Sequence, residues 1–181
     1  MERSGQARTD PDERIAWLVD TLAGYPAADI VDFQVHLDGL RDRIDTYRLW
    51  GAAWTICGGL CSDDGFWYFQ AWLIGQGRAV YEAVAADPDA LADVPAITRL
   101  AGRKTDEWAE DEWPDWESLD DVAEDAYENA VDGDLQLRLD ERGHDFRLSP
   151  DPSDAEWDFE DDAERESRFP RLSRMFPPPF V

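Results

Sequence analysis

The stretch that decides the fold is residues 49–77, which read LWGAAWTICGGLCSDDGFWYFQAWLIGQG. Its first part, residues 49–57, is apolar nearly all round, a pattern typical of a helix that is buried on every side. Gly58 and Gly59 follow directly, and glycine commonly ends a helix. Ser62 is a favoured N-cap residue, and an aromatic-rich run comes after it. The stretch therefore predicts two buried helices, joined by a short loop, at the centre of the protein.

Further helices are predicted on both sides of this centre. Residues 10–24 and residues 26–44 each carry apolar side chains at helical spacing, with a cap or a proline at the start. Residues 80–87 continue the pattern for about two turns until a proline stops it. We expect residues 10–104 to form a helical core domain. Residues 1–9 are polar, and we expect them to be disordered.

The negative charge is concentrated in one third of the chain. The protein has 181 residues, the length of one domain, and a formal net charge of -25. Residues 105–166 hold 26 acidic and 4 basic side chains, whereas residues 1–104 hold 16 and 10. Nine tryptophans and 43% hydrophobic residues indicate a folded chain in spite of this charge. The expected electrostatic partners are basic surfaces. Direct binding to nucleic acid or to a membrane is not expected, because both require Lys and Arg.

The cysteines and the apolar runs indicate a cytoplasmic location. Cys57 and Cys61 are too few for the disulfide framework of a small secreted domain, and no apolar run reaches membrane-spanning length. A zinc site needs four ligands, and a second Cys or His pair is missing. We therefore expect two buried thiols, no metal site and no cofactor, and the sequence leaves the oligomeric state open.

Residues 105–181 are expected to form an acidic helix, then a hairpin or loop, and a C-terminal segment that docks on the core. Residues 118–130 show an apolar stripe against a polyacidic face. Residues 135–148 begin with leucines that alternate with polar residues, which is compatible with a small β-hairpin. The fold class predicted from the whole chain is all-α. It is a compact helical bundle with an acidic C-terminal extension and at most one small β-hairpin.

Several motifs resemble a known family. They are Leu49-Trp50-Gly51-Ala52-Ala53, Gly58-Gly59-Leu60-Cys61-Ser62-Asp63-Asp64-Gly65-Phe66, Trp72-Leu73-Ile74-Gly75-Gln76-Gly77-Arg78, Trp157-Asp158-Phe159 and Arg168-Phe169-Pro170-Arg171-Leu172. Over about residues 12–93 and the last 25 residues, the chain resembles the family catalogued as domain of unknown function 4240. The resemblance implies a small, all-helical bacterial protein. It implies no reaction, substrate or cofactor.

The loop Ser62-Asp63-Asp64-Gly65 is the candidate for a ligand site. Two carboxylates within one helical turn can share a hard cation, or can divide the roles of acid and base between them. The competing interpretation is that Ser62 caps the helix and that both carboxylates favour its dipole. Both interpretations fit the sequence.

Four tryptophans near the carboxylates are the candidates for partner binding: Trp108, Trp113, Trp116 and Trp157. Aromatic residues are enriched at the centres of protein interfaces. The function that the sequence favours is a noncatalytic binding or regulatory module that presents an acidic surface to a basic protein partner. The competing interpretation is a solvated acidic face that keeps the protein soluble.

The alternative function is a small-ligand-binding protein or a metal-dependent enzyme that uses the loop at Ser62. Gln76 and Arg78, beyond the aromatic helix, would complete this site, since Arg is suited to bidentate contact with an anionic ligand. An internal salt bridge of Arg78 to Asp63 or Asp64 is the competing interpretation.

Overall fold

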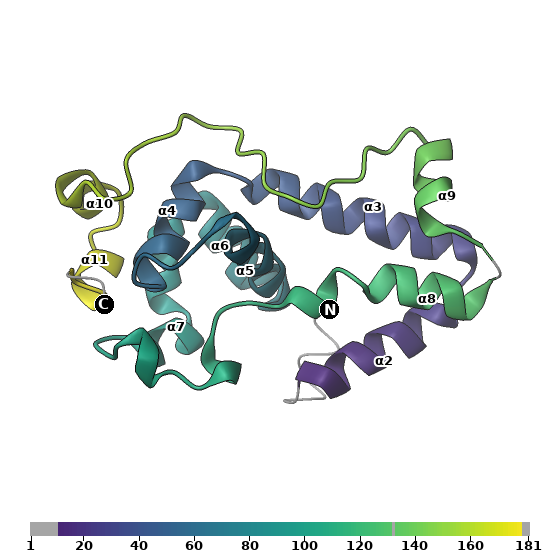
Figure 1. Ribbon diagram of the computed structural model, residues 1–181, viewed down its shortest axis with the longest axis horizontal. Coiled ribbons are helices and arrows are strands. Elements are labelled where there is room, and N and C mark those ends of the chain that lie inside the picture. The colour runs from purple at the N-terminus through teal and green to yellow at the C-terminus, as the bar shows by residue number, and fades with distance from the viewer. Residues whose placement is uncertain (1–10, 132, 179–181) are drawn as a thin grey trace.

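The computed structural model describes residues 11–131 and 133–178, and the expected disorder of residues 1–9 lies outside them. All regular structure in the described residues is helical, so the predicted mainly-α class is confirmed (Figure 1). The α-helices are α2 (Pro11–Ala23), α3 (Ala27–Ile44), α4 (Tyr47–Ile56), α5 (Asp63–Gly75), α6 (Arg78–Ala86), α7 (Pro95–Leu100), α8 (Val122–Ala130), α9 (Leu135–Glu141), α10 (Asp162–Arg168) and α11 (Leu172–Met175). Short 3-10 helices are η1 (Pro88–Asp93), η2 (Thr105–Glu107), η3 (Glu110–Glu112) and η4 (Glu117–Leu119). None of the described helices is both long enough and apolar enough to cross a membrane.

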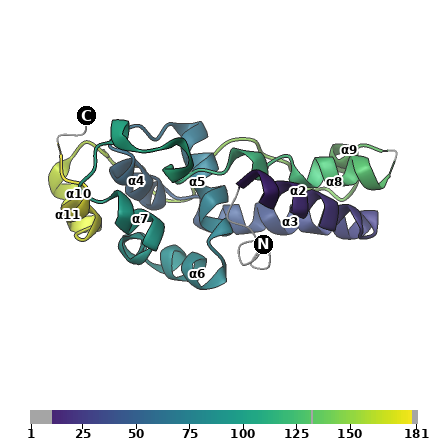
Figure 2. The same ribbon diagram turned by 90° about the horizontal axis from the view of Figure 1, so that it is seen from below.

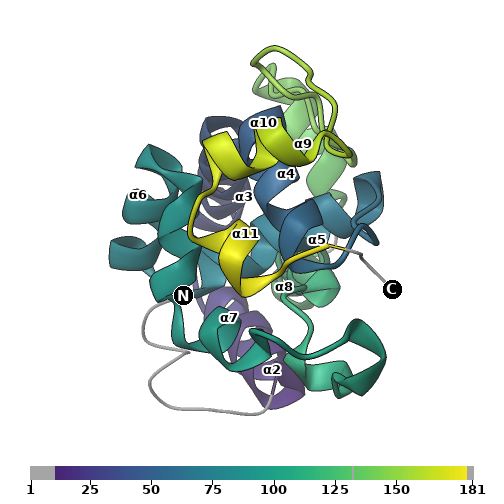
Figure 3. The same ribbon diagram turned by 90° about the vertical axis from the view of Figure 1, so that its left-hand side faces the viewer.

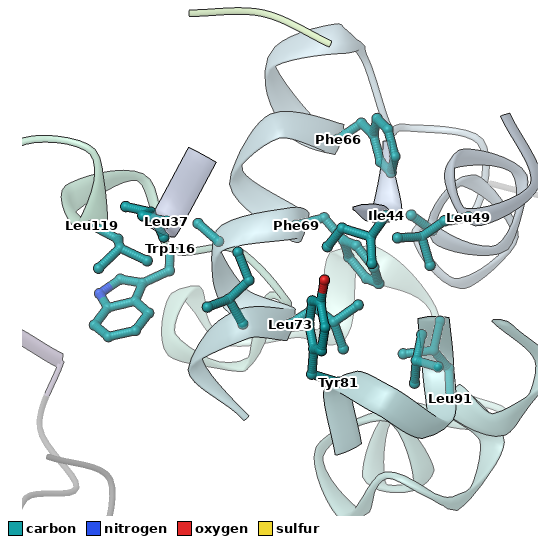
Figure 4. Close-up of a cluster of buried hydrophobic side chains, with 14 of the residues drawn as sticks. Leu37, Ile44, Leu49, Phe66, Phe69, Leu73, Tyr81, Leu91, Trp116 and Leu119 are labelled. Carbon is teal, nitrogen blue, oxygen red and sulfur yellow. The ribbon is translucent and has the colours of Figure 1, made fainter. Parts of the chain in front are cut away.

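Helices α4 and α5 form the centre that the sequence predicts. Thr46 caps α4 and Ser62 caps α5, and each hydroxyl accepts a hydrogen bond of 3.1 Å from a backbone N–H of the first turn. Gly58 and Gly59 have φ angles of 60° and 85°, the left-handed conformation that terminates α4. Figure 4 shows the buried side chains around this pair, among them Phe66, Phe69 and Leu73 of α5, with Ile44, Leu49, Tyr81 and Leu91 from other elements.

The helices form two groups along the long axis of the molecule (Figures 1 and 2). In one group, α8 packs against α2 and α3, although it lies far from both in the sequence. The other group contains α4 to α7, and the end-on view of Figure 3 shows α10 and α11 beside α4. Helix α3 has 18 residues, about 27 Å, and links the two groups. The acidic helix α8 is therefore part of the packed body.

The expected β-hairpin at residues 135–148 is wrong, because the first half of this segment forms α9. Leu135 and Leu139 are buried, whereas Leu137 is 55% exposed. Residues four apart share one face of a helix, so alternating leucines in so short a run fit a helix as well as a strand. The helix is selected by its cap, because Asp134 accepts a hydrogen bond of 3.1 Å from the Leu137 N–H.

After α9 the chain follows α3 without regular secondary structure (Figure 1). We call residues 142–154 the strap. Its basic side chains contact carboxylates of α3: Arg142 pairs with Asp32, and His144 Nε2 lies 2.7 Å from Asp38 Oδ2. The strap is thus held to α3 mainly by polar contacts.

Asp45, directly after α3, is the main attachment point of the strap. Its side chain is 2% exposed and accepts hydrogen bonds from Gln70 Nε2 (3.0 Å) and the Asp151 N–H (2.7 Å). Arg147 Nη1 lies 3.4 Å from the same carboxylate, and the Asp45 carbonyl accepts from the Ser153 N–H (2.9 Å). One buried carboxylate therefore joins α3, α5 and the strap.

Candidate functional sites

The predicted loop site has the geometry of a helix N-terminus. Ser62, Asp63 and Asp64 are all exposed, and the Ser62 hydroxyl accepts its hydrogen bond from the Gly65 N–H. Asp63 and Asp64 occupy the first turn of α5, where the helix dipole favours negative charge. None of these residues lines the two cavities described below. The contacts of the loop are those of a capped helix.

Gln76 and Arg78 lie at the opposite end of α5. Gln76 Nε2 donates to a backbone carbonyl of its own helix (3.3 Å), and Arg78 is the first residue of α6, one turn before Glu82. Helix α5 has 13 residues, so it separates these two residues from Ser62 by about 20 Å. The structure thus does not bring the five predicted ligand residues together, and Arg78 does not reach the carboxylates of the loop.

The thiols of Cys57 and Cys61 are free and buried. A hydrogen bond between the two thiols, together with burial, raises the pKa of Cys57 well above its ordinary value, so the thiol stays protonated at neutral pH. Within residues 11–131 and 133–178, no three His, Cys, Asp or Glu side chains are grouped so that they could hold a metal ion.

Trp116, one of the predicted partner-binding residues, lies against the body of the protein. Its ring packs on Gly75, where an added Cβ atom would come within 2.7 Å of two ring carbons. The guanidinium of Arg14 lies 4.1 Å from the ring centroid, and the backbone N–H of Trp116 donates to the Tyr68 carbonyl (3.1 Å). Only 7% of Trp116 is exposed. This ring anchors the acidic segment to α5.

The other three predicted tryptophans also pack inward. Trp108 is 8% exposed and meets Trp113 edge to face, with 4.9 Å between the ring centroids. Trp157 is half-buried, and its Nε1 donates to the Tyr47 carbonyl of α4 (3.1 Å). Trp113 and Trp157 each leave part of the side chain exposed to solvent. Trp108 and Trp116 are almost fully buried, so a partner could contact very little of either side chain. The chain near these tryptophans is therefore held against the body of the protein.

Helix α8 carries a row of carboxylates on its outer face. We call the four exposed residues Asp121, Glu124, Asp125 and Glu128 the acidic ridge, of which Asp121 is the N-cap residue directly before α8. Their spacing of three and four residues places them on one side of the helix. The opposite side is buried and consists of Val122, Ala123, Ala126 and Tyr127. This is the polyacidic face that the sequence predicts.

Other carboxylates of the acidic segment have cationic partners. Glu112 accepts two hydrogen bonds from Arg103. These bonds are the main reason why the pKa of Glu112 falls to about 2. Asp120 pairs with Arg41 and accepts from the Trp67 indole N–H (2.9 Å). Burial raises the pKa of Asp120, and both partners oppose that rise. The ridge differs from them, because no cationic side chain of the described residues pairs with it.

A shallow depression of about 370 Å³ lies beside the ridge, between α2 and α8. Ile15, Ala16 and Val19 of α2 contribute apolar surface to it. Asp20 and Asp125, both exposed, contribute a carboxylate from each helix. Apolar surface and two carboxylates are thus combined in one place, which the sequence does not reveal because α2 and α8 meet only in the fold.

A larger cavity of about 820 Å³, which we call the apolar groove, lies between α2, α3 and α6. Its apolar lining comes from Trp17, Leu18, Leu22, Tyr25, Phe33, Leu37, Leu40, Ile74, Tyr81 and Val122. Its polar and charged lining comes from Thr21, His36, Arg43, Arg78 and Glu82. The helical stripes of α2 and α3 are visible in the sequence, where they predict core packing. In the folded protein these stripes remain partly exposed, and this depends on the position of α6.

The comparisons with known proteins give a family and no function. No curated protein and no solved structure matches the chain. The family model described as "Protein of unknown function (DUF4240)" matches residues 1–129, which include the acidic ridge and end before the motifs at residues 157–172. With well over half of its length matched, the chain belongs to this family of proteins of unknown function, DUF4240.

Proposed function

We propose that the protein is a noncatalytic binding module whose acidic ridge engages a basic protein partner. The observation that carries the proposal is a row of four exposed carboxylates on α8 without a cationic partner among the described residues. The tryptophan anchors hold the chain before α8 against the body. The ridge is therefore a rigid surface, and a partner would not have to order it on binding.

The ridge combines charges that the helix dipole favours with one that it disfavours, since Glu124 and Asp125 lie in the first turn of α8. Asp121 and Asp125, and Glu124 and Glu128, are like-charged pairs at a spacing of four residues, and each such pair destabilises a helix by about 0.2–0.5 kcal/mol. Glu128 also lies in the last turn, where the helix dipole disfavours negative charge. Solubility requires net charge but no particular row of charges. Glu128, which both the repulsion and the dipole disfavour, is not explained by the stability of α8 and supports a role in binding.

The depression between α2 and α8 supports the choice of a partner rich in Lys and Arg. The aliphatic part of such a side chain can lie on Ile15 and Val19, while its charged end reaches the carboxylates of Asp20 and Asp125. A small metal ion would find two carboxylates here and no third His, Cys, Asp or Glu among the described residues.

The strap provides a precedent within the same chain. Arg142 and Arg147 hold an extended segment against α3 through Asp32, Asp42 and Asp45. Carboxylates on and directly after one helix of this protein thus already bind arginines of an extended segment. A partner segment on the ridge of α8 would use the same kind of contact.

The test is capture of partners from a native lysate at low and at high salt, followed by affinity measurements with the identified partner. A triple variant of the ridge, Glu124→Gln, Asp125→Asn and Glu128→Gln, is compared with wild type. The matched control, Asp145→Asn, Glu156→Gln and Glu160→Gln, changes the net charge equally at exposed positions outside the ridge.

The proposal predicts a basic partner that high salt releases. Its affinity should fall about tenfold or more in the ridge variant and by less than about twofold in the control. Equal losses in both variants would show general charge attraction and refute the ridge as the site. Failure to find any salt-sensitive partner would refute the proposal itself.

A further inference from the structure

The two cysteines of the chain form a second candidate site, which is independent of the acidic ridge. Cys57 directly follows α4, and Cys61 directly precedes Ser62, the N-cap residue of α5. Both thiols are free and buried, with 6% and 7% of each residue exposed. The hydrogen bond between them places the two sulfur atoms in contact. Two thiols thus meet at the two ends of one short loop.

The backbone of each cysteine is held in place by hydrogen bonds. The Cys57 N–H donates to the Ala53 carbonyl (2.9 Å) in the last turn of α4, and the Cys61 carbonyl accepts from the Trp50 indole N–H (3.0 Å). The Cys61 thiol lies over the first turn of α5, where a Cβ atom added at Gly65 would be 3.8 Å from its sulfur. The packing of α4 and α5 therefore keeps the two thiols together.

The loop between the cysteines can adapt to a covalent bond. A disulfide bond is about 2 Å long, shorter than the contact between two thiols, so the sulfur atoms have to approach each other. The loop consists of Gly58 and Gly59, which have no side chain, and Leu60, which is 61% exposed. No loop side chain is fixed in the core, and glycine tolerates the backbone adjustment. The approach therefore leaves the core packing intact.

The surroundings of the pair favour uncharged sulfur. The hydrogen bond with Cys61, burial and the nearby Asp115 carboxylate raise the pKa of Cys57. Dithiols whose reduced form is stabilised are the ones that give up their disulfide most easily, and a thiolate is not stabilised at Cys57. A disulfide carries no charge, so it fits a buried position beside a carboxylate better than a thiolate does.

We propose that Cys57 and Cys61 form a reversible disulfide, with a low-molecular-weight disulfide such as oxidised glutathione as the oxidant. The thiolate of one cysteine attacks a sulfur of oxidised glutathione, whose S–S bond breaks, and the first glutathione leaves as a thiolate. The second cysteine loses its proton to solvent, attacks the mixed disulfide and displaces the second glutathione. One S–S bond forms in the protein, and one oxidised glutathione is reduced to two thiols.

Trp50 connects the cysteine pair to the rest of the fold. Its ring stacks on Phe66 of α5, with 5.0 Å between the ring centroids, and lies 6.1 Å from the ring of Phe159 in the C-terminal region. Its indole N–H donates to the Cys61 carbonyl. A bond that draws Cys61 toward Cys57 shifts this carbonyl, so the Trp50 indole N–H resonance reports the oxidation state of the pair.

The test equilibrates the full-length protein with glutathione buffers of increasing ratio of oxidised to reduced form. Each ratio is approached from the reduced and from the oxidised protein, once folded and once unfolded in urea. Alkylation after acid quenching, followed by mass spectrometry, counts the free thiols. Non-reducing electrophoresis separates disulfides within one chain from those between chains. The sequence has two cysteines, so a disulfide within one chain is the bond between Cys57 and Cys61.

We expect the equilibrium constant for this disulfide to be at least about tenfold larger in the folded than in the unfolded protein, because the unfolded chain does not hold the thiols together. The Trp50 indole resonance should shift on oxidation and return on reduction. It should stay in place in Cys57→Ala and in Cys61→Ala, the controls for effects of the buffer. If these variants do not fold, the comparison of folded with unfolded wild type still decides.

Three outcomes overturn the proposal. The first is an equilibrium constant in the folded protein that is equal to or below that of the unfolded chain, because the fold would then hold the thiols apart. The second is a folded protein whose thiols stay free at ratios that oxidise the unfolded chain. The third is a disulfide that forms only between chains.

Discussion

The indole ring of Trp157 occupies the space above Gly51 of α4, so that a Cβ atom at position 51 would lie 2.1 Å from ring carbon Cζ2. That distance is far inside van der Waals contact, and the ring would have to move. Its Nε1 donates to the Tyr47 carbonyl over 3.1 Å, so the movement would break a hydrogen bond as well. Gly51 thus makes room for the Trp157 ring on α4.

Gly51→Ala is therefore predicted to lower the free energy of unfolding by about 1–3 kcal/mol. The intrinsic preference of a helix for alanine, about 1 kcal/mol, would act in the opposite direction. Gly39→Ala in α3 is the control, because a Cβ atom there meets nothing within 4 Å, and it should stabilise by about 0.5–1 kcal/mol. Urea denaturation measures both variants, and effects of the same sign would contradict the role given to the ring.

Asp45→Ala is predicted to destabilise the protein by about 2–4 kcal/mol, because it leaves Gln70 and the Asp151 N–H without their buried acceptor. Asp42→Ala also removes a carboxylate that pairs with Arg147, but an exposed one, and should cost less than about 1 kcal/mol. Hydrogen exchange at the Asp151 amide should accelerate strongly in Asp45→Ala and little in Asp42→Ala. Similar exchange in both variants would show that Asp45 does not hold the strap.

The pair of Glu112 and Arg103 should make stability depend on pH in acid. The pKa of Glu112 is about 2 in the folded protein, against an ordinary value of 4.5, chiefly because Arg103 donates hydrogen bonds to it. The lowered pKa means that the pair stabilises the folded state above about pH 4.5 and loses this effect as the pH falls toward 2. The stability difference between wild type and Glu112→Gln should therefore be constant near neutral pH and shrink over that range. A difference that stays the same down to pH 2 would contradict the assignment.

Glu128→Gln is predicted to stabilise the protein by about 0.5 kcal/mol. It removes repulsion from Glu124 and Asp125 and a negative charge from the last turn of α8. Glu124→Gln should have a smaller effect, because Glu124 lies in the first turn, where the dipole favours it. Thermal unfolding at low salt measures both variants. Destabilisation by Glu128→Gln would mean that the ridge is paired in solution, against the proposed function.

Ser62→Ala should lower stability by about 1 kcal/mol, whereas Ser62→Asp, which retains a capping oxygen, should be close to wild type. Asp63→Asn and Asp64→Asn should each change stability by less than about 0.5 kcal/mol, since both side chains are exposed. Calcium and magnesium should leave the unfolding temperature of wild type unchanged. Stabilisation by either ion that Asp63→Asn abolishes would restore the loop as a metal site.

The features that the sequence predicts correctly are those that depend on neighbours within one or two turns. Ser62 caps α5, Gly58 and Gly59 end α4, and the carboxylates of Glu124 and Glu128 share one face of α8. Each follows from the helical repeat and from hydrogen bonds between residues a few positions apart. The leucines at residues 135–139 mark the limit of this reasoning, because three alternating residues are too few to distinguish a strand from a helix.

The sequence by itself therefore determined that this protein is helical, where α5 begins and where α4 ends, and that one helix face is acidic. Only the tertiary structure decided that Trp157 packs on Gly51, that the strap ends on the buried carboxylate of Asp45, and that α2, α3 and α6 leave a groove between them. The physical reason is the distance along the chain. Local hydrogen bonds and periodicity act between near neighbours, whereas these contacts join segments whose meeting depends on how all the helices pack together.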